Sequence, residues 1–330
     1  MVKRFINKEI SPADFEFLVS KATKAPSGHN TQPWRFRQNG SAVEIHPDFD
    51  RRLPVVDPDD RELFVSLGCA AENLCLAAQN IGYESSVAVG DTGVIAVALA
   101  EGADVKSSPL FEQIDLRQTN RSIYTGEEIA LDALKRLQAI RSEDGVSVHY
   151  YARQTKQFND IEQYVLRGNT HQMQNEAFKA ELKSWMRFNK KHQDQTLDGL
   201  SYAVFGAPNV PRWMAEPIMA MAINAKTQNK ADREKIASAS HLVLFTTREN
   251  SRREWVNLGR TLQRFLLTAT ELGIAHAYLN QPNEQPEIAA EMTKTLDLDG
   301  EYPTVLLRVG YGERQAYSKR RPIGDVIAAD

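Results

Sequence analysis

Two apolar segments of this chain, 191 positions apart, have related sequences and the length of long helices. LGCAAENLCLAAQNIGY at 67–83 aligns without gaps with LGRTLQRFLLTATELGI at 258–274. Five of the seventeen positions are identical, where background composition predicts about one. The identical positions are Leu67, Gly68, Leu76, Ala78 and Gly82. The repeat predicts two copies of one fold in tandem.

A second alignment, offset by 119 positions, places Phe5 against Tyr124 and Ile10 against Ile129. Turn-forming residues in EGADVKSSP mark a seam within 101–116. We therefore expect a first, trimmed copy at 1–108 and a second, fuller copy at 109–330.

The two copies differ in length. From Ile10 to Gly68 the first copy spans 58 positions, and from Ile129 to Gly259 the second spans 130. The additional residues fall mostly within 155–240, where polar helical sequence precedes an aromatic and proline-rich connection.

Local patterns predict an α+β fold. Apolar residues at helical spacing after Ser11-Pro12 predict a helix over 11–24, and a long apolar helix is expected over 63–81, ending at Gly82. Residues 42–46 and 94–99 are typical of strands, the second of them buried.

Bulk properties exclude several partners. The chain has 40 Lys and Arg against 43 Asp and Glu, so no overall field attracts nucleic acid or an anionic membrane. The longest apolar run, Gly93 to Ala100, is much shorter than the roughly 20 residues that cross a bilayer.

Compartment and metal content are predicted from the same composition. The start, MVKRFINKEISPADF, lacks the apolar region of a signal peptide, so a cytoplasmic location is expected. Cys69 and Cys75 should be reduced core residues on different faces of their helix. The seven histidines lack zinc-ligand spacing, and no metal is predicted.

The stretch APSGHNTQPWRF at 25–36 is built almost wholly of amides, hydroxyls, glycine and proline. Such side chains offer donors and acceptors without net charge, which suits a ligand edge that mixes both kinds of group, such as a flavin ring. Pro26 and Pro33 stiffen the two ends of the stretch.

This stretch resembles the flavin-contacting loop of the nitroreductase family, whose pattern is roughly P-S-x-x-N-x-Q-P-W. The matching residues are Pro26, Ser27, Asn30, Gln32, Pro33 and Trp34. Arg117-Gln118-Thr119-Asn120-Arg121 resembles the family's phosphate-gripping R-x-S-x-R element, with Thr in place of Ser. PTVLLRVGYG and SKRRPIGDVI resemble its closing strand and basic tail, so the likeness spans the chain.

The resemblance implies an α+β, nitroreductase-like fold whose two copies form a pseudo-two-fold dimer within one chain, as in the tandem, Acg-like branch. Family dimers hold each FMN between the first element of one subunit and the P-S-x-x-N loop of the other. At an offset of 119, residues 26–34 align with 145–153, GVSVHYYAR, which lacks the loop's polar groups. The first copy also lacks an R-x-S-x-R element, so a single FMN per chain is expected.

The same resemblance assigns the cofactor site. The expected residues are Pro26, Ser27, Gly28, Asn30, Gln32, Arg117, Thr119, Asn120, Arg121, Lys235, Arg320 and Arg321. The loop would orient the ring, the arginines would hold the phosphate, and Lys235 would stabilise charge on the reduced flavin. Asp232 departs from the family's usual Asn and puts that last contact in doubt. The alternative is that these cations are solvated surface charges.

The implied activity is FMN-dependent reduction of a small acceptor, such as a nitroaromatic or a quinone, by NAD(P)H. Flavin N5 would carry the chemistry, and no catalytic side chain is expected. The alternative is a flavin-storage protein in which residues 199–217, with Tyr202, Phe205 and Trp213, form a lid over the ring. Those aromatics could instead pack the core of the long insertion, and further homodimerisation is left open.

Overall fold

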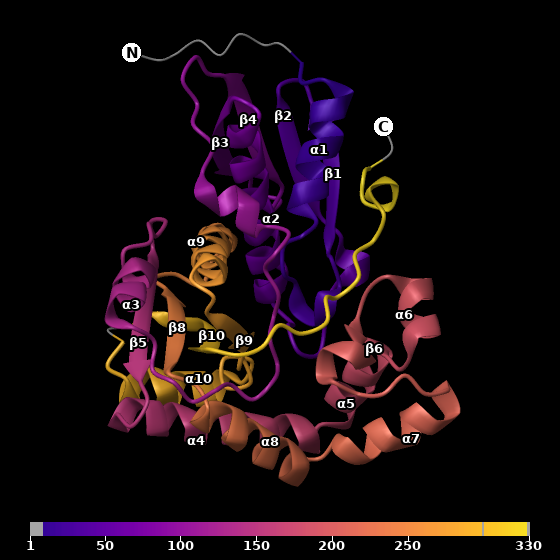
Figure 1. The fold of residues 1–330 in the computed structure, drawn as a ribbon, viewed down its shortest axis with the longest axis vertical. Coiled ribbons are helices and arrows are strands. Elements are labelled where there is room, and N and C mark those ends of the chain that lie inside the picture. Colours follow the sequence, from indigo (N-terminus) through magenta and orange to yellow (C-terminus); the bar gives the residue numbers. More distant parts are fainter. Residues whose placement is uncertain (1–8, 299, 329–330) are drawn as a thin grey trace.

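Two four-stranded antiparallel sheets lie at opposite ends of the molecule, and two long helices run between them (Figure 1). This arrangement is seen in a computed structural model that describes residues 9–298 and 300–328, without the side chains of 218–222.

The first sheet belongs to the N-terminal third of the chain and has the strand order β1-β2-β4-β3. Its elements are α1 (Pro12–Ala22), β1 (Trp34–Asn39), β2 (Ala42–Pro47), α2 (Arg61–Asn80), β3 (Tyr83–Val89) and β4 (Ile95–Glu101). The expected helices and strands of this region are thereby confirmed. Helix α1 begins where Ser11 Oγ accepts a hydrogen bond from Asp14 N at 3.0 Å.

The expectation of a fully buried strand at 94–99 was wrong in one respect. Ile95, Val97 and Leu99 are buried, but the alternate alanines are partly exposed. Because successive side chains of a strand point to opposite faces, only one face of β4 packs on the core. Because alanine is also apolar, the alanines on the other face hid the alternation of buried and exposed positions in the sequence.

The second sheet repeats this connectivity, with the strand order β5-β8-β10-β9. Its elements are α3 (Leu131–Gln138), β5 (Val146–Ala152), β8 (His241–Thr247), α9 (Arg252–Glu271), β9 (Ala275–Tyr278) and β10 (Tyr302–Gly310). Disregarding insertions, both units run helix, strand, strand, helix, strand, strand, and neighbouring strands in both sheets are antiparallel.

The alignment of 26–34 with 145–153 is out of register. Residues 146–152 form strand β5, which holds the place in its sheet that β1 holds in the other. The counterpart of the loop between α1 and β1 is the connection between α3 and β5, AIRSEDG at 139–145. That connection also lacks the P-S-x-x-N pattern, because it is a shorter turn.

The extra residues of the second unit lie between β5 and β8, as predicted. A two-residue turn, Gly40-Ser41, joins the equivalent strands β1 and β2. The insertion contains α4 (Lys156–Gln174), α5 (Glu176–Ser184), β6 (Met186–Arg187), α6 (Lys190–Thr196), β7 (Leu200–Ser201), η4 (Tyr202–Phe205), α7 (Arg212–Ala222) and α8 (Ala225–Ala237). Phe178 of the insertion packs on Leu53 and Val56 of the first unit.

Shorter elements complete the described chain. Helix α10 (Pro286–Thr295) joins β9 to β10. The 3₁₀ turns are η1 (Gly28–Asn30), η2 (Phe49–Arg51), η3 (Pro109–Gln113) and η5 (Ile323–Asp325).

Helices α2 and α9 cross in backbone contact at Gly68 and Gly259, which are equivalent positions of the sequence repeat. A Cβ atom on Gly259 would lie 2.1 Å from Val65 O, and one on Gly68 would lie 2.2 Å from Val256 O. Only glycine permits this approach, because any side chain would overlap the facing backbone. The two helices contribute much of a core shared by both units.

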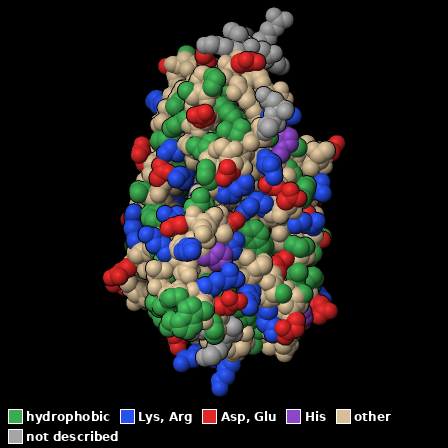
Figure 2. Space-filling view, turned by 90° about the vertical axis from the view of Figure 1, so that its right-hand side faces the viewer, with side chains coloured by type: hydrophobic (Ala, Val, Ile, Leu, Met, Phe, Trp, Pro, Cys, Tyr) green, Lys and Arg blue, Asp and Glu red, His purple; other side chains and the backbone are tan. Residues whose placement is uncertain are grey.

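The C-terminal tail returns from the second unit to the first (Figure 1). Phe36 N donates to Val326 O at 2.8 Å, and Ala328 N donates to Phe36 O at 2.8 Å. The tail thus pairs in parallel with the free edge of β1. Figure 2 shows that Lys and Arg side chains are interspersed with Asp and Glu on one face of the molecule.

Gly259→Ala should destabilise the protein by about 1 to 3 kcal/mol, because an added methyl overpacks the helix crossing by more than alanine gains in helix propensity. Urea unfolding checks this. Gly324→Ala is the matched control, since a Cβ there meets nothing within 4 Å. Equal free energies of unfolding for the two variants would show that the two helices can move apart at the crossing without loss of stability.

Candidate functional site

A cavity of about 550 Å³ is lined by residues from both units. Its lining includes Pro26, Ser27, Gly28, His29, Asn30, Glu62, Cys69, Arg117, Thr119, Arg121, Phe178, Phe205, Leu262, Tyr278, Asn280, Glu284, Tyr317 and Arg320. The first unit supplies the loop 26–30 and part of α2, and the second supplies the segment 117–121, the insertion and the tail.

Eight of the twelve sequence-predicted site residues line this cavity. They are Pro26, Ser27, Gly28, Asn30, Arg117, Thr119, Arg121 and Arg320. The structure therefore brings together two motifs, 26–30 and 117–121, that are separated by more than a quarter of the chain.

Three arginines form a cationic group on the cavity wall. Arg117 is 5% exposed and donates from Nη2 to Lys24 O at 3.1 Å, while its Nε and Nη1 are buried without a partner among the described residues. Arg320 donates from Nη1 to Asn30 Oδ1 at 2.8 Å and from Nε to Thr23 O at 2.9 Å. The Arg121 guanidinium lies 5.6 Å from the centroid of the Phe205 ring.

No carboxylate of the described residues lies within ion-pairing distance of these three groups. Burial lowers the pKa of Arg117 and Arg121, and burial together with the nearby Arg117 lowers the pKa of Arg320 to about 9. Buried like charges are unfavourable unless an anion joins them. The orphaned donors of Arg117 therefore fit a phosphate or another dense anion.

The loop 26–32 is held in a strained backbone conformation. His29, Asn30 and Gln32 all have positive φ angles, 46°, 55° and 54°, which non-glycine residues rarely adopt. Its amides bind protein groups: Asn30 Nδ2 donates to Gly199 O and to Lys319 O, both at 3.2 Å. Such strain persists because the insertion and the tail hold the loop from two sides.

The other four predicted residues are placed elsewhere. Gln32 is fully buried, donates from Nε2 to Leu197 O at 3.0 Å and accepts from Arg321 N at 2.8 Å. Arg321 donates from Nη2 to Asp325 O at 2.6 Å. Asn120 Nδ2 donates to Glu313 O at 2.7 Å. These three side chains fasten the tail, a long-range contact that local sequence cannot indicate.

Lys235 is the fourth residue outside the cavity lining, and its amine lies 3.7 Å from Asp232 Oδ1. Asp232, the departure from the family pattern, is buried and accepts hydrogen bonds from Asn169 at 2.9 Å and Gln228 at 3.0 Å. Because Asp232 is ionic where the family has an amide, it binds the lysine and orients two amides that do line the cavity.

Sequence reasoning missed a polar group on the other part of the wall. Glu62 of α2 and Glu284 are in hydrogen-bond contact, and Asn280 Nδ2 donates to Glu62 Oε1 at 2.9 Å. The stretch NQPNEQP at 280–286 resembles the loop 25–36 in its amides and prolines, and that likeness of composition was the available indication. No sequence pattern indicated Glu62, because it lies in a largely apolar helix.

The three aromatics of the alternative lid are placed differently. Phe205 lines the cavity, but Tyr202 is absent from the lining and Trp213 is 75% exposed. Apolar side chains of the insertion form the remaining wall, namely Met173, Phe178, Leu182, Met186, Leu200 and Ile223.

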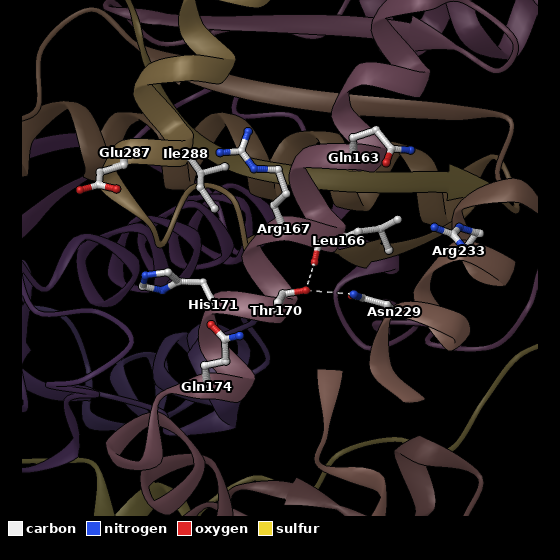
Figure 3. Close-up of a pocket in the computed structure, with 10 residues that line it drawn as sticks. All are labelled: Gln163, Leu166, Arg167, Thr170, His171, Gln174, Asn229, Arg233, Glu287 and Ile288. Atoms are coloured by element: carbon white, nitrogen blue, oxygen red, sulfur yellow. Dashed lines mark hydrogen bonds between the residues drawn. The ribbon is translucent and has the colours of Figure 1, made fainter. Parts of the chain in front are cut away.

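A second pocket, of about 420 Å³, lies between α4, α8 and α10 (Figure 3). Both of its arginines are paired with carboxylates: Arg167 binds Glu291 at 2.6 Å, and Arg233 lies 3.4 Å from Glu162. Thr170 donates to Leu166 O at 2.9 Å and accepts from Asn229 at 3.1 Å. These satisfied groups make it the weaker candidate for an ionic ligand.

Among the described residues, no helix is both long and apolar enough to cross a membrane. No cluster of three or more His, Cys, Asp or Glu among them is arranged to hold a metal ion.

The family model described as "Nitroreductase family" matches residues 114–311. The chain belongs to the nitroreductase family, which confirms the family resemblance found in the sequence. "Putative NAD(P)H nitroreductase Rv3131" of Mycobacterium tuberculosis is 25% identical over 333 positions, covering 94% of this chain and 90% of that protein.

Solved structures similar to this chain include two bacterial nitroreductases. FMN-dependent NfnB from Mycobacterium smegmatis, in complex with NADPH, is 12% identical with a TM-score of 0.42, covering 66% of this chain and 96% of that chain. A Bacteroides fragilis nitroreductase with bound FMN is 14% identical with a TM-score of 0.41, covering 68% and 100%.

His276 predicts a pH dependence of stability. Burial, and then Arg117, lower the pKa of His276 from 6.5 to about 3. Between these two pH values the unfolded chain therefore binds a proton on His276 that the folded chain does not bind. Stability should fall as pH drops through this window. In His276→Phe the loss between pH 7 and about pH 4.5 should be smaller by about 1 to 3 kcal/mol. Urea unfolding at each pH measures it.

His171→Asn is the control, because His171 is exposed. An identical pH slope in His276→Phe and the parent would contradict the assignment.

Proposed function

We propose that this protein is an FMN-dependent NAD(P)H oxidoreductase that reduces small acceptors such as nitroaromatics or quinones. The observation that carries the proposal is the group of three cavity arginines without a carboxylate partner among the described residues, beside a strained polar loop. Family membership and the name of the mycobacterial relative support the same activity.

In this proposal Arg117, Arg121 and Arg320 hold the phosphate of FMN. Arg117 offers the free donors Nε and Nη1, and a phosphate monoester, with about two negative charges, satisfies them bidentately. The loop 26–30, through Ser27 and Asn30, would hold the ring. When bound, the flavin accepts a hydride from NAD(P)H and passes the electrons to the acceptor.

We further propose that residues 1–108 and 109–330 are tandem copies forming a pseudo-two-fold dimer. The repeated connectivity and the meeting of equivalent glycines support this. The P-S-x-x-N loop occurs in the first copy and the R-x-T-x-R element in the second, so the proposal includes one FMN per chain. A cytoplasmic location belongs to the same proposal, and both cysteines are free and buried.

The alternative is a flavin-storage protein with a lid. Trp213 is exposed and only Phe205 of the three aromatics lines the cavity, which supports turnover over storage. The apolar wall of the insertion gives an acceptor or a nicotinamide a surface to pack on.

The first test is cofactor content and reduction. The purified protein should release one equivalent of FMN per chain on denaturation, and anaerobic NADPH should bleach the flavin absorbance of the intact protein. Quantified flavin and its mass give the stoichiometry. Two equivalents, or FAD, would overturn the single-site proposal, and a flavin that NADPH leaves oxidised would favour storage.

The second test is Arg117→Met. Losing one partner of a buried charge-assisted pair costs about 2 to 5 kcal/mol, which weakens FMN binding about 30-fold or more. Titration of the cofactor-free protein with FMN, followed by flavin fluorescence, measures the affinity. Arg314→Met, at an exposed arginine of the tail, is the matched control. Unchanged affinity in Arg117→Met would remove the phosphate assignment.

A further inference from the structure

A pair of carboxyl groups lies on the cavity wall. Glu62 projects from α2 and Glu284 from the turn that precedes α10, and the two side chains are in hydrogen-bond contact. Both line the cavity. Two carboxyl groups in contact cannot both be ionised without strong repulsion, so the pair holds one proton between them.

Neighbouring amides hold both carboxyl groups in place. Asn280 Oδ1 accepts from Leu306 N at 3.0 Å, and this bond fixes the amide so that its Nδ2 donates to Glu62 Oε1 at 2.9 Å. Glu284 accepts from Gln172 Nε2. Each carboxyl group thus keeps its second oxygen for the proton that the pair shares.

The charges around the pair maintain this state. Burial and the contact with Glu62 raise the pKa of Glu284 well above its usual range, and Arg61 on α2 opposes them. Asp57, before α2, has its pKa raised to about 7 by burial and then by Glu62. From the loop, His29 faces Glu62 with its pKa lowered to about 4 by burial, so it stays neutral.

The pair also adjoins the loop that contacts the ring in the proposed function. A Cβ atom on Gly28 would lie 3.1 Å from Glu62 Oε2, so the Glu62 member of the pair lies against that loop. The arginines are on the same cavity. An acceptor that reaches the loop therefore reaches a protonated carboxyl group as well.

We propose that Glu284, held beside Glu62, is a catalytic residue that donates a proton to the acceptor. This proposal rests on the proposed function. Reduction of a quinone takes two electrons and two protons: NAD(P)H, one further proton and quinone give NAD(P)⁺ and hydroquinone. NAD(P)H supplies a hydride equivalent, and Glu284 supplies the remaining proton. The Glu284 O–H bond breaks as an O–H bond forms on the acceptor, and the carboxylate then takes a proton from water.

The test compares two acceptors in Glu284→Gln. A quinone needs the proton, whereas ferricyanide takes electrons alone. General acid catalysis contributes about 100-fold or more, so quinone turnover should fall by about that factor while ferricyanide turnover stays within about twofold. Glu287→Gln, an exposed glutamate three positions further along, is the matched control and should leave both rates unchanged.

A second readout needs no turnover. The infrared spectrum at neutral pH should contain the carbonyl band of a protonated carboxylic acid that disappears in Glu284→Gln and persists in Glu287→Gln. In Glu62→Gln, Glu284 loses the charge that keeps it protonated and the band should weaken.

The outcomes separate this proposal from the one it rests on. Equal losses with quinone and ferricyanide would mean that Glu284 only supports the cavity, and unchanged quinone turnover or a persisting band would overturn the donor role. If NADPH fails to reduce the flavin in the parent protein, the proposed function itself fails, whatever the variants do.

Discussion

The contact between Gly68 and Gly259 sets the distance between the two halves of the molecule, and the cavity depends on that distance. Because neither helix carries a side chain at the crossing, α2 and α9 meet backbone to backbone. Both helices also line the cavity, where α2 presents Glu62, Val65, Ser66 and Cys69 and α9 presents Leu262. A wider crossing would move the loop 26–30 away from the segment 117–121, and the candidate site needs both.

Charged side chains beside the crossing fix the register of the helices. Glu72 is 4% exposed and binds Arg264 at 2.6 Å and Arg260 at 3.1 Å, and Glu143 binds the same two arginines at 2.6 Å and 3.2 Å. Two acids and two bases make this buried network neutral, which offsets much of its desolvation cost. A sliding movement of one helix along the other would separate these pairs, so the network opposes a change of register.

Sequence reasoning recovered what depends on local pattern and missed what depends on long-range contact. The repeat located α2 and α9 and the larger second unit, because the periodicity of a helix depends on residues that are close together in the sequence. The ungapped offset of 119 failed at strand β5, because the connection 139–145 is shorter than its counterpart and shifts all later positions. Gln32 and Arg321 matched the family motif, yet they bind each other's segment, since the path of the tail is not visible in sequence. Glu284 lay outside every motif and became visible only when the fold placed it beside Glu62.

The arginines of the cavity and those of the helix crossing differ in whether they have carboxylate partners, and this difference affects folding. At the crossing each arginine has carboxylate partners, whereas Arg117, Arg121 and Arg320 have none among the described residues, and burial lowers the pKa of all three. The crossing is therefore complete within the polypeptide, while the cavity is electrostatically incomplete without an anion. An anion that binds only the folded chain stabilises it in proportion to the logarithm of its concentration over its dissociation constant. Arg320 of the tail lines the cavity and binds Asn30 of the strained loop 26–32, so an anion held by this guanidinium group would contact a residue that also holds the loop in place.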